Sequence, residues 1–214
     1  MDRAIVRKEL RESAAIVAVG LLFAGWMLLN LTGAMLGPRF RPSNIPFLSG
    51  QVTSLVLWVG AGVAIALGLK QTAWEKHNDT FRFLLHRPIA RERLLAVKLL
   101  VGWLLTLLVT GSAVLVYALW AATPGSVDAP FRWSMTLPAW GQVASLSIVY
   151  LGAFASGIGP GRWFGTRLAP LVASAIAAMS ANAAPQPWLG WLLGVAAAAA
   201  LLTAIWLHAR TRDF

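Results

Sequence analysis

Carboxylates are the first candidates for chemistry in this chain, because carboxylates inside a membrane are the usual proton and sodium carriers of ion-coupled transporters. The eight are Asp2, Glu9, Glu12, Glu75, Asp79, Glu92, Asp128 and Asp213. We predict that all of them lie outside the membrane-crossing segments of the chain. This placement argues against an ion-coupled transporter, which stays open as an alternative.

The other reactive side chains form no catalytic arrangement. His77, His86 and His208 lie in connections or at the end of an apolar segment, away from the serines inside those segments. His77 and His86 are nine residues apart, a spacing that does not place two metal ligands on one helical face. Cysteine is absent, which excludes thiol nucleophiles, thiolate metal sites and disulfides. We predict that the chain is not an enzyme and binds no metal.

A phosphate-binding loop is also missing. The nearest glycine-rich run, residues 157–165 (GIGPGRWFG), lacks the lysine of the G-x-x-x-x-G-K-[ST] loop that reaches the phosphates of ATP. A flexible turn between two apolar segments is the better interpretation of this run. We expect no cofactor in this chain, so that any ATP and Mg²⁺ would be bound by a separate subunit.

The densest charge lies in residues 75–98, EKHNDTFRFLLHRPIARERLLAVK. Within it, an apolar stripe recurs at the three- and four-residue spacing of one helical face: Phe81, Leu84, Leu85 and Pro88. Polar residues able to cap a helix precede the stripe, and Pro88 disfavours helical geometry at Arg87. The pattern predicts a short amphipathic helix.

This predicted helix has two interpretations. It could lie on the bilayer, with its apolar face in the headgroup layer and its arginines on lipid phosphates. It could instead dock its apolar face into a groove on a cytoplasmic partner protein. The spacing alone does not separate the two.

The segments before and after this charged segment are apolar. The chain is 58% hydrophobic and 12% charged, which is typical of a membrane protein. Crossing a bilayer takes about 20 helical residues. We therefore predict an all-α polytopic protein with one transmembrane domain, residues 1–214, and six spans: 14–36, 51–69, 94–120, 138–157, 166–182 and 188–207.

The cations predict the orientation of these spans. Alternate connections on one side hold all but three of the 18 lysines and arginines, the exceptions being Arg39, Arg41 and Arg132. Positively charged connections stay in the cytoplasm, so both termini are predicted to be cytoplasmic. Removing one span would spoil the segregation, which supports six. Basic residues spread over short connections favour lipids rather than nucleic acid as partners.

Three polar or amphipathic residues stand out near the middle of the first two spans. Trp26 and Asn30 are four residues apart and share a helical face, and Trp58 lies within the second span. They could line a translocation pathway or a dimer interface. They could also be packed between helices of one subunit, with their polar atoms bonded locally. Small residues at four-residue spacing, such as Gly60, Ala64 and Gly68, predict close helix packing without naming the neighbour.

The order of residues in the charged segment resembles a known family, the permeases of the ABC-2 class of ATP-binding-cassette transporters. The matching positions are Glu75, Thr80, Leu84, Leu85, Pro88, Arg91 and Lys98. The segment VRKELRE, Val6 to Glu12, is similar to the amphipathic helix that precedes the first span in that family. Asp79 departs from the glycine that many relatives carry, and the connection SANAAPQP is short compared with relatives that insert re-entrant helices there.

The resemblance implies that residues 75–93 form a cytoplasmic coupling helix between spans two and three. It implies a permease subunit, expected to export, in a bacterial inner membrane, with a separate ATPase subunit and a second permease copy or homologue. Phe81, Leu84 and Leu85 would fill a groove of the ATPase, and His86, Arg87 and Arg91 would contact its rim. Glu75 would brace the segment, and Thr80 and Pro88 would bound the helix.

A rival hypothesis is a membrane scaffold or anchor whose basic cytoplasmic face binds lipid or another partner. It predicts that residues 75–93 bind anionic liposomes as an isolated peptide. It also predicts that no Walker-motif protein is recovered with the purified chain.

Overall fold

The computed structural model describes residues 2–33, 45–74, 91–127, 129–159 and 166–211. Most of these residues are helical, with no strand among them, which confirms the predicted all-α class. In chain order the helices are α1 (Asp2–Leu31), α2 (Gln51–Leu69), the π-helix η1 (Lys70–Trp74), α5 (Arg91–Ala122), the 3₁₀ helix η2 (Trp133–Thr136), α6 (Leu137–Ile158), α7 (Ala169–Ala183) and α8 (Pro187–Thr211).

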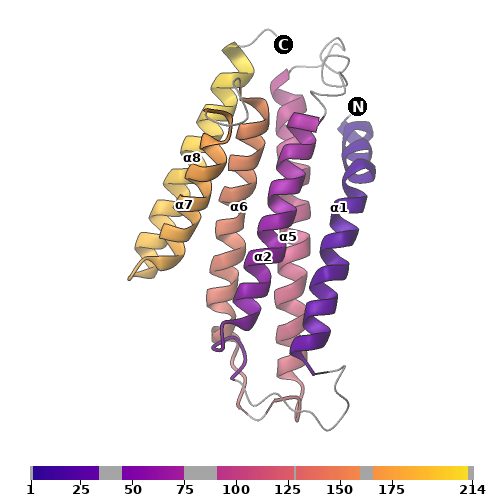
Figure 1. Ribbon diagram of the computed structural model, residues 1–214, viewed down its shortest axis with the longest axis vertical. Helices are drawn as coiled ribbons and strands as arrows, with labels where there is room; N and C mark the ends of the chain where they lie inside the picture. The colour runs from indigo at the N-terminus through magenta and orange to yellow at the C-terminus, as the bar shows by residue number, and fades with distance from the viewer. Residues whose placement is uncertain (1, 34–44, 75–90, 128, 160–165, 212–214) are drawn as a thin grey trace.

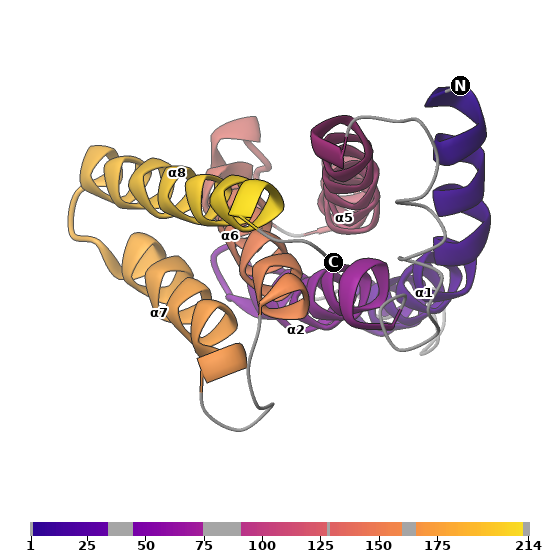
Figure 2. The ribbon, with the colours of Figure 1, turned by 90° about the horizontal axis from the view of Figure 1, so that it is seen from above.

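The long helices run up and down along one direction, so that α1 begins and α8 ends at the same end of the bundle (Figure 1). We call this the terminal end and the other the opposite end. Seen along the bundle, α2, α5 and α6 occupy the centre, with α1 on one flank and the α7–α8 hairpin on the other (Figure 2). The principal packing is α2 on α6, α6 on α7, and α1 on α5 and α2.

Within the described part of the chain, five helices are long and apolar enough to cross a membrane: Arg3–Leu31, Gln51–Trp74, Glu92–Ala122, Trp133–Ile158 and Pro187–His208. The predicted spans 51–69, 94–120, 138–157 and 188–207 each lie within one of them. These long apolar helices indicate an integral membrane protein.

The predicted fifth span, 166–182, is the exception. Its helix α7 has 15 residues, or about 22 Å of length, against a hydrocarbon core of about 30 Å. Pro170 stands in the first turn, where proline is tolerated because no helical N–H is needed there. In Figure 1 the α7–α8 turn stops short of the far ends of α2, α5 and α6. Six crossings are thus not confirmed, and α7 is a short apolar helix.

The first helix also differs from the prediction of an amphipathic segment followed by a separate span at residue 14. Residues 2–31 form one continuous helix. The reason is local, because no glycine or proline occurs between Asp2 and Val19 to interrupt the helix. The helix ends at Leu31, earlier than the predicted residue 36, and Gly33 follows with a left-handed φ of 70°.

Small residues bring α2 close to its neighbours inside one chain. A Cβ added at Gly68 would lie 2.7 Å from the Cβ of Ala153 and 2.8 Å from the backbone nitrogen of Phe154. A Cβ added at Gly20 on α1 would lie 2.6 Å from a methyl of Val63 on α2. The small residues therefore serve packing within the subunit, a point that their spacing had left open.

Candidate functional site

An ion pair between α1 and α5 lies at the heart of the terminal end. The Glu9 Oε1 and Lys98 Nζ atoms are 2.9 Å apart, and both side chains are 0% exposed. A charged pair without access to water is stable only when its remaining donors and acceptors are also satisfied. The surrounding residues meet this requirement.

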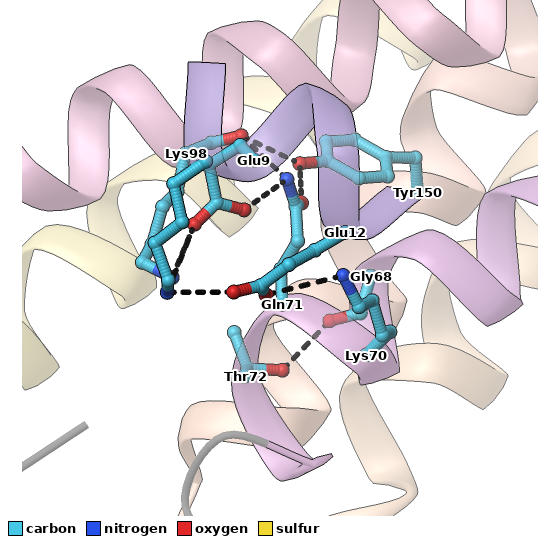
Figure 3. A network of polar contacts seen from close by, with 9 residues as sticks. Glu9, Glu12, Gly68, Lys70, Gln71, Thr72, Lys98 and Tyr150 are labelled. Atoms are coloured by element: carbon cyan, nitrogen blue, oxygen red, sulfur yellow. Dashed lines mark hydrogen bonds and ion pairs between the residues drawn. The ribbon is translucent and has the colours of Figure 1, made fainter. Parts of the chain in front are cut away.

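Gln71 of η1 links the pair to the backbone of α5. Its Nε2 donates to Glu9 Oε2 at 3.2 Å and to the carbonyl oxygen of Lys98 at 3.1 Å. The Tyr150 hydroxyl of α6 donates to Gln71 Oε1 at 2.7 Å, with the Leu99 carbonyl oxygen 3.2 Å away as a second acceptor. We call Glu9, Gln71, Lys98 and Tyr150 the buried polar node (Figure 3).

The node depends on the local form of the chain around it. The π-helix places Gln71 at the junction of the four elements, and π-turns inside helices often mark functional positions. Gly102 of α5 leaves the space that Tyr150 and Gln71 occupy, since an added Cβ there would collide with both side chains. The Thr72 hydroxyl donates to the Gly68 carbonyl oxygen at 2.7 Å, which closes the turn that carries Gln71.

A second, more exposed set of charges forms the rim of the node. Glu12 Oε1 lies 3.4 Å from Lys8 Nζ on the same helix, and Glu12 Oε2 lies 3.3 Å from Lys70 Nζ at the start of η1. Glu12 is 36% exposed, so this pairing contributes little to stability. It adds a second contact between α1 and the end of α2 (Figure 3).

Other polar contacts at the terminal end involve α8 and the end of α6. Arg210 Nε of α8 donates to Glu92 Oε1 of α5 at 2.9 Å, and the guanidinium lies 3.6 Å from the centre of the Trp206 ring. Arg167 donates to the Ser156 and Gly157 carbonyl oxygens at 3.2 and 3.1 Å, which satisfies the last turn of α6. Burial lowers the pKa of the Arg167 guanidinium from its usual value.

Most of the predicted ATPase-contact residues lie outside the described part of the chain: Glu75, Thr80, Phe81, Leu84, Leu85, His86, Arg87 and Pro88. Arg91 is the first residue of α5, and its side chain is not described. The flanks of the segment are described. Trp74 ends η1 and Arg91 begins α5, both at the terminal end beside the node.

The residues predicted to line a pathway or a dimer interface lie on the outer surface of the single chain. Trp58 is 71% exposed and Trp26 is 53% exposed, so these two indole rings are not packed between helices of the single chain. Trp26 stacks on Phe23 with ring centres 5.7 Å apart. Asn30 donates its amide to the Trp26 carbonyl oxygen at 2.8 Å, a local bond of the kind that the alternative of packing within one subunit expected.

The prediction that every carboxylate lies outside the membrane-crossing segments did not anticipate that the side chain of Glu9 is completely buried in the bundle. The residue was assigned to a polar segment ahead of the first span, whereas α1 is continuous and packs that segment against α5 and η1. A signal was available, because Ile5, Glu9 and Ser13 recur at four-residue spacing on one face and all three are buried. Gln71 and Tyr150, also missed, are polar side chains within or next to apolar segments.

The polar groups of the site can hold helices together. Among the residues described, no three histidines, cysteines or carboxylates lie close enough to hold a metal ion. The node instead joins α1, η1, α5 and α6 by hydrogen bonds, of which those to the Glu9 carboxylate are charge-assisted. Comparison of the chain with protein-family models, curated proteins and solved structures gave no match.

Proposed function

We propose that the chain is the membrane-spanning permease subunit of an ATP-binding-cassette transporter of the ABC-2 class, acting as an exporter with a separate ATPase subunit. In this proposal it crosses a bacterial inner membrane six times with both termini in the cytoplasm. The segment 75–93 is its coupling helix. ATP and Mg²⁺ are bound by the partner, because this sequence has no phosphate-binding loop.

One observation supports the proposal beyond the sequence pattern. Gln71, three residues before the end of η1, donates to the carbonyl oxygen of Lys98, seven residues into α5. The two flanks of segment 75–90 are therefore bonded to each other and, through Glu9 and Tyr150, to α1 and α6. A force applied to the segment would act on four helices at once, as coupling to an ATPase requires.

The docking residues are tested by Leu84→Arg, which would place a cation in the apolar groove proposed on the ATPase. We expect the variant to lose the co-purified ATPase subunit and transport-coupled hydrolysis while still inserting into the membrane. Leu48→Arg is the matched control, because Leu48 is 66% exposed in the turn before α2, at the opposite end. Retention of ATPase assembly by Leu84→Arg would show that the docking assignment is wrong.

The second permease copy is proposed to meet this chain at the outer faces of α1 and α2. Trp26 and Trp58 are large, exposed and apolar there, and Asn30 lies on the same helix as Trp26. Because cysteine is absent, Trp58→Cys provides a unique crosslinking position. We expect a crosslinked dimer from Trp58→Cys in membranes and none from Leu207→Cys on α8. The reverse result would move the interface to α8.

The buried Glu9–Lys98 pair favours one second candidate, an ion-coupled transporter. Ionisable residues inside membrane proteins often pair with one another, and carboxylates among them serve in proton relays. This candidate predicts transport that persists after ATP depletion and stops when a protonophore collapses the proton gradient. The permease proposal predicts dependence on ATP.

A further inference from the structure

We propose that the outward face of the first three turns of α1 binds the headgroups of anionic phospholipids through Arg3, Arg7 and Arg11. These three residues, the arginine row, recur at four-residue spacing and are exposed. The inference requires that the chain spans a membrane. It does not rest on the proposed transport function.

The arginine row lies opposite the face of α1 that packs on the bundle. The bundle-facing positions Ile5 and Glu9 are 8% and 0% exposed. Each arginine lies two positions from such a residue, which is a rotation of about 200° around the helix. The row therefore faces away from α2 and α5, towards the surroundings of the protein.

The same outward face changes abruptly from charged to apolar. Beyond Arg11 it continues with Leu22, 74% exposed, and Leu29, 47% exposed. Residues 12–31 span about 30 Å of helix, which equals the thickness of the hydrocarbon core. Arg11 then stands at the edge of that core, and Arg7 and Arg3 lie about 6 and 12 Å farther out. This range of depths covers the phosphate layer of one leaflet.

The row has no counter-charge within the described part of the protein. The acids on the neighbouring face of α1 are engaged elsewhere, Glu9 with Lys98 and Glu12 with Lys8 and Lys70. Guanidinium groups bind phosphate through paired hydrogen bonds, which an ammonium group cannot form in the same geometry. A phosphate-bearing lipid with net negative charge is the partner that matches the position and the charge of the row.

The test uses the full-length protein in detergent, mixed with equimolar dioleoyl-phosphatidylglycerol and dioleoyl-phosphatidylcholine, with bound lipid counted by native mass spectrometry. Each cation near an anionic membrane surface contributes about fivefold in affinity. We expect wild type to prefer phosphatidylglycerol, and Arg7→Gln/Arg11→Gln to lose that preference by about tenfold or more. Arg132→Gln, the same change at an exposed position of the opposite end, should keep it.

Two results would overturn the proposal. One is a wild-type protein with no preference for phosphatidylglycerol. The other is a double variant that keeps the preference, and if this variant also loses a co-purified protein, the row is assigned to an acidic protein partner. Circular dichroism of each variant checks that helix content is unchanged, and Arg7→Lys/Arg11→Lys should restore part of the preference because charge is retained.

Discussion

At the scale of single residues, the Glu9–Lys98 pair shows how much a membrane-embedded bundle depends on matched charge. Both side chains are completely buried, and two of the other groups around them, Gln71 and Tyr150, are neutral and hydrogen-bonded. Removing one member of a buried pair leaves the other charge without compensation, which costs more than the pair itself contributes.

Glu9→Gln is therefore expected to lower the free energy of unfolding by about 3 kcal/mol, and Glu9→Gln/Lys98→Met to recover much of that loss. The measurement is reversible unfolding in mixed detergent micelles followed by circular dichroism. Glu92→Gln is the control, because it breaks the exposed pair with Arg210 and should cost at most about 1 kcal/mol. A loss for Glu9→Gln as small as the control would contradict the burial of the pair.

Ser13 lies one turn beyond Glu9 on the same face of α1, and unlike Glu9 it has no polar partner among the residues described. Its hydroxyl is buried, and it is the only such side-chain oxygen or nitrogen without a hydrogen-bond partner in the described residues. An unsatisfied buried hydroxyl is unfavourable, so Ser13→Ala should raise the free energy of unfolding by about 1 kcal/mol. Destabilisation by Ser13→Ala in the same unfolding assay would indicate a partner for the hydroxyl, such as bound water.

At the scale of helices, α2 and α6 meet at Gly68 of α2, where the space admits only a glycine. Phe154 contributes its backbone nitrogen to that contact, and a backbone atom cannot move aside as a side chain can. Gly62, on the same helix, has nothing within 4 Å of an added Cβ. Alanine substitutions at Gly68 and Gly62 therefore separate the effect of packing on stability from the effect of helix propensity.

We expect Gly68→Ala to destabilise the protein by about 1–3 kcal/mol through overpacking. Gly62→Ala should instead be neutral or stabilise by up to about 1 kcal/mol, because alanine favours the helix more than glycine does. Thermal unfolding in detergent compares the two. Equal effects at both positions would mean that α2 and α6 are farther apart than described.

At the scale of the whole molecule, the path of the chain through the bilayer depends on the short helix α7. The segregation of cations favours six crossings, whereas α7 is about 8 Å shorter than the hydrocarbon core. A helix this short crosses only if the bilayer thins or flanking residues reach the interface. Arg167 at the start of α7 is such a flanking residue.

Single cysteines in this cysteine-free chain decide the path. We expect Arg3→Cys and Arg210→Cys to react with a membrane-impermeant maleimide from one side of the membrane, and Pro124→Cys and Pro185→Cys from the other. Sealed inverted vesicles and intact cells provide the two sides. Labelling of Pro185→Cys from the same side as Arg3→Cys and Arg210→Cys would mean that neither α7 nor α8 crosses, and would leave four spans.

The sequence by itself determined the elements of this protein. Apolar length and composition located α2, α5, α6 and α8, because each is a long local segment whose hydropathy depends only on its own residues. Local composition also predicts the continuity of α1, since helix formers run unbroken to Val19, although the charges around Glu9 led us to divide it.

Only the tertiary structure decided which residues meet. Glu9 and Lys98 are 89 residues apart in the chain, and Tyr150 and Gln71 are 79 apart. No local pattern carries information about such partners, which depend on how the helices rotate and pack against one another. The same reason applies to Gly68 and Gly62, which no local pattern distinguishes. Only the position of α6 shows that Gly68 must lack a side chain, whereas Gly62 has space for one.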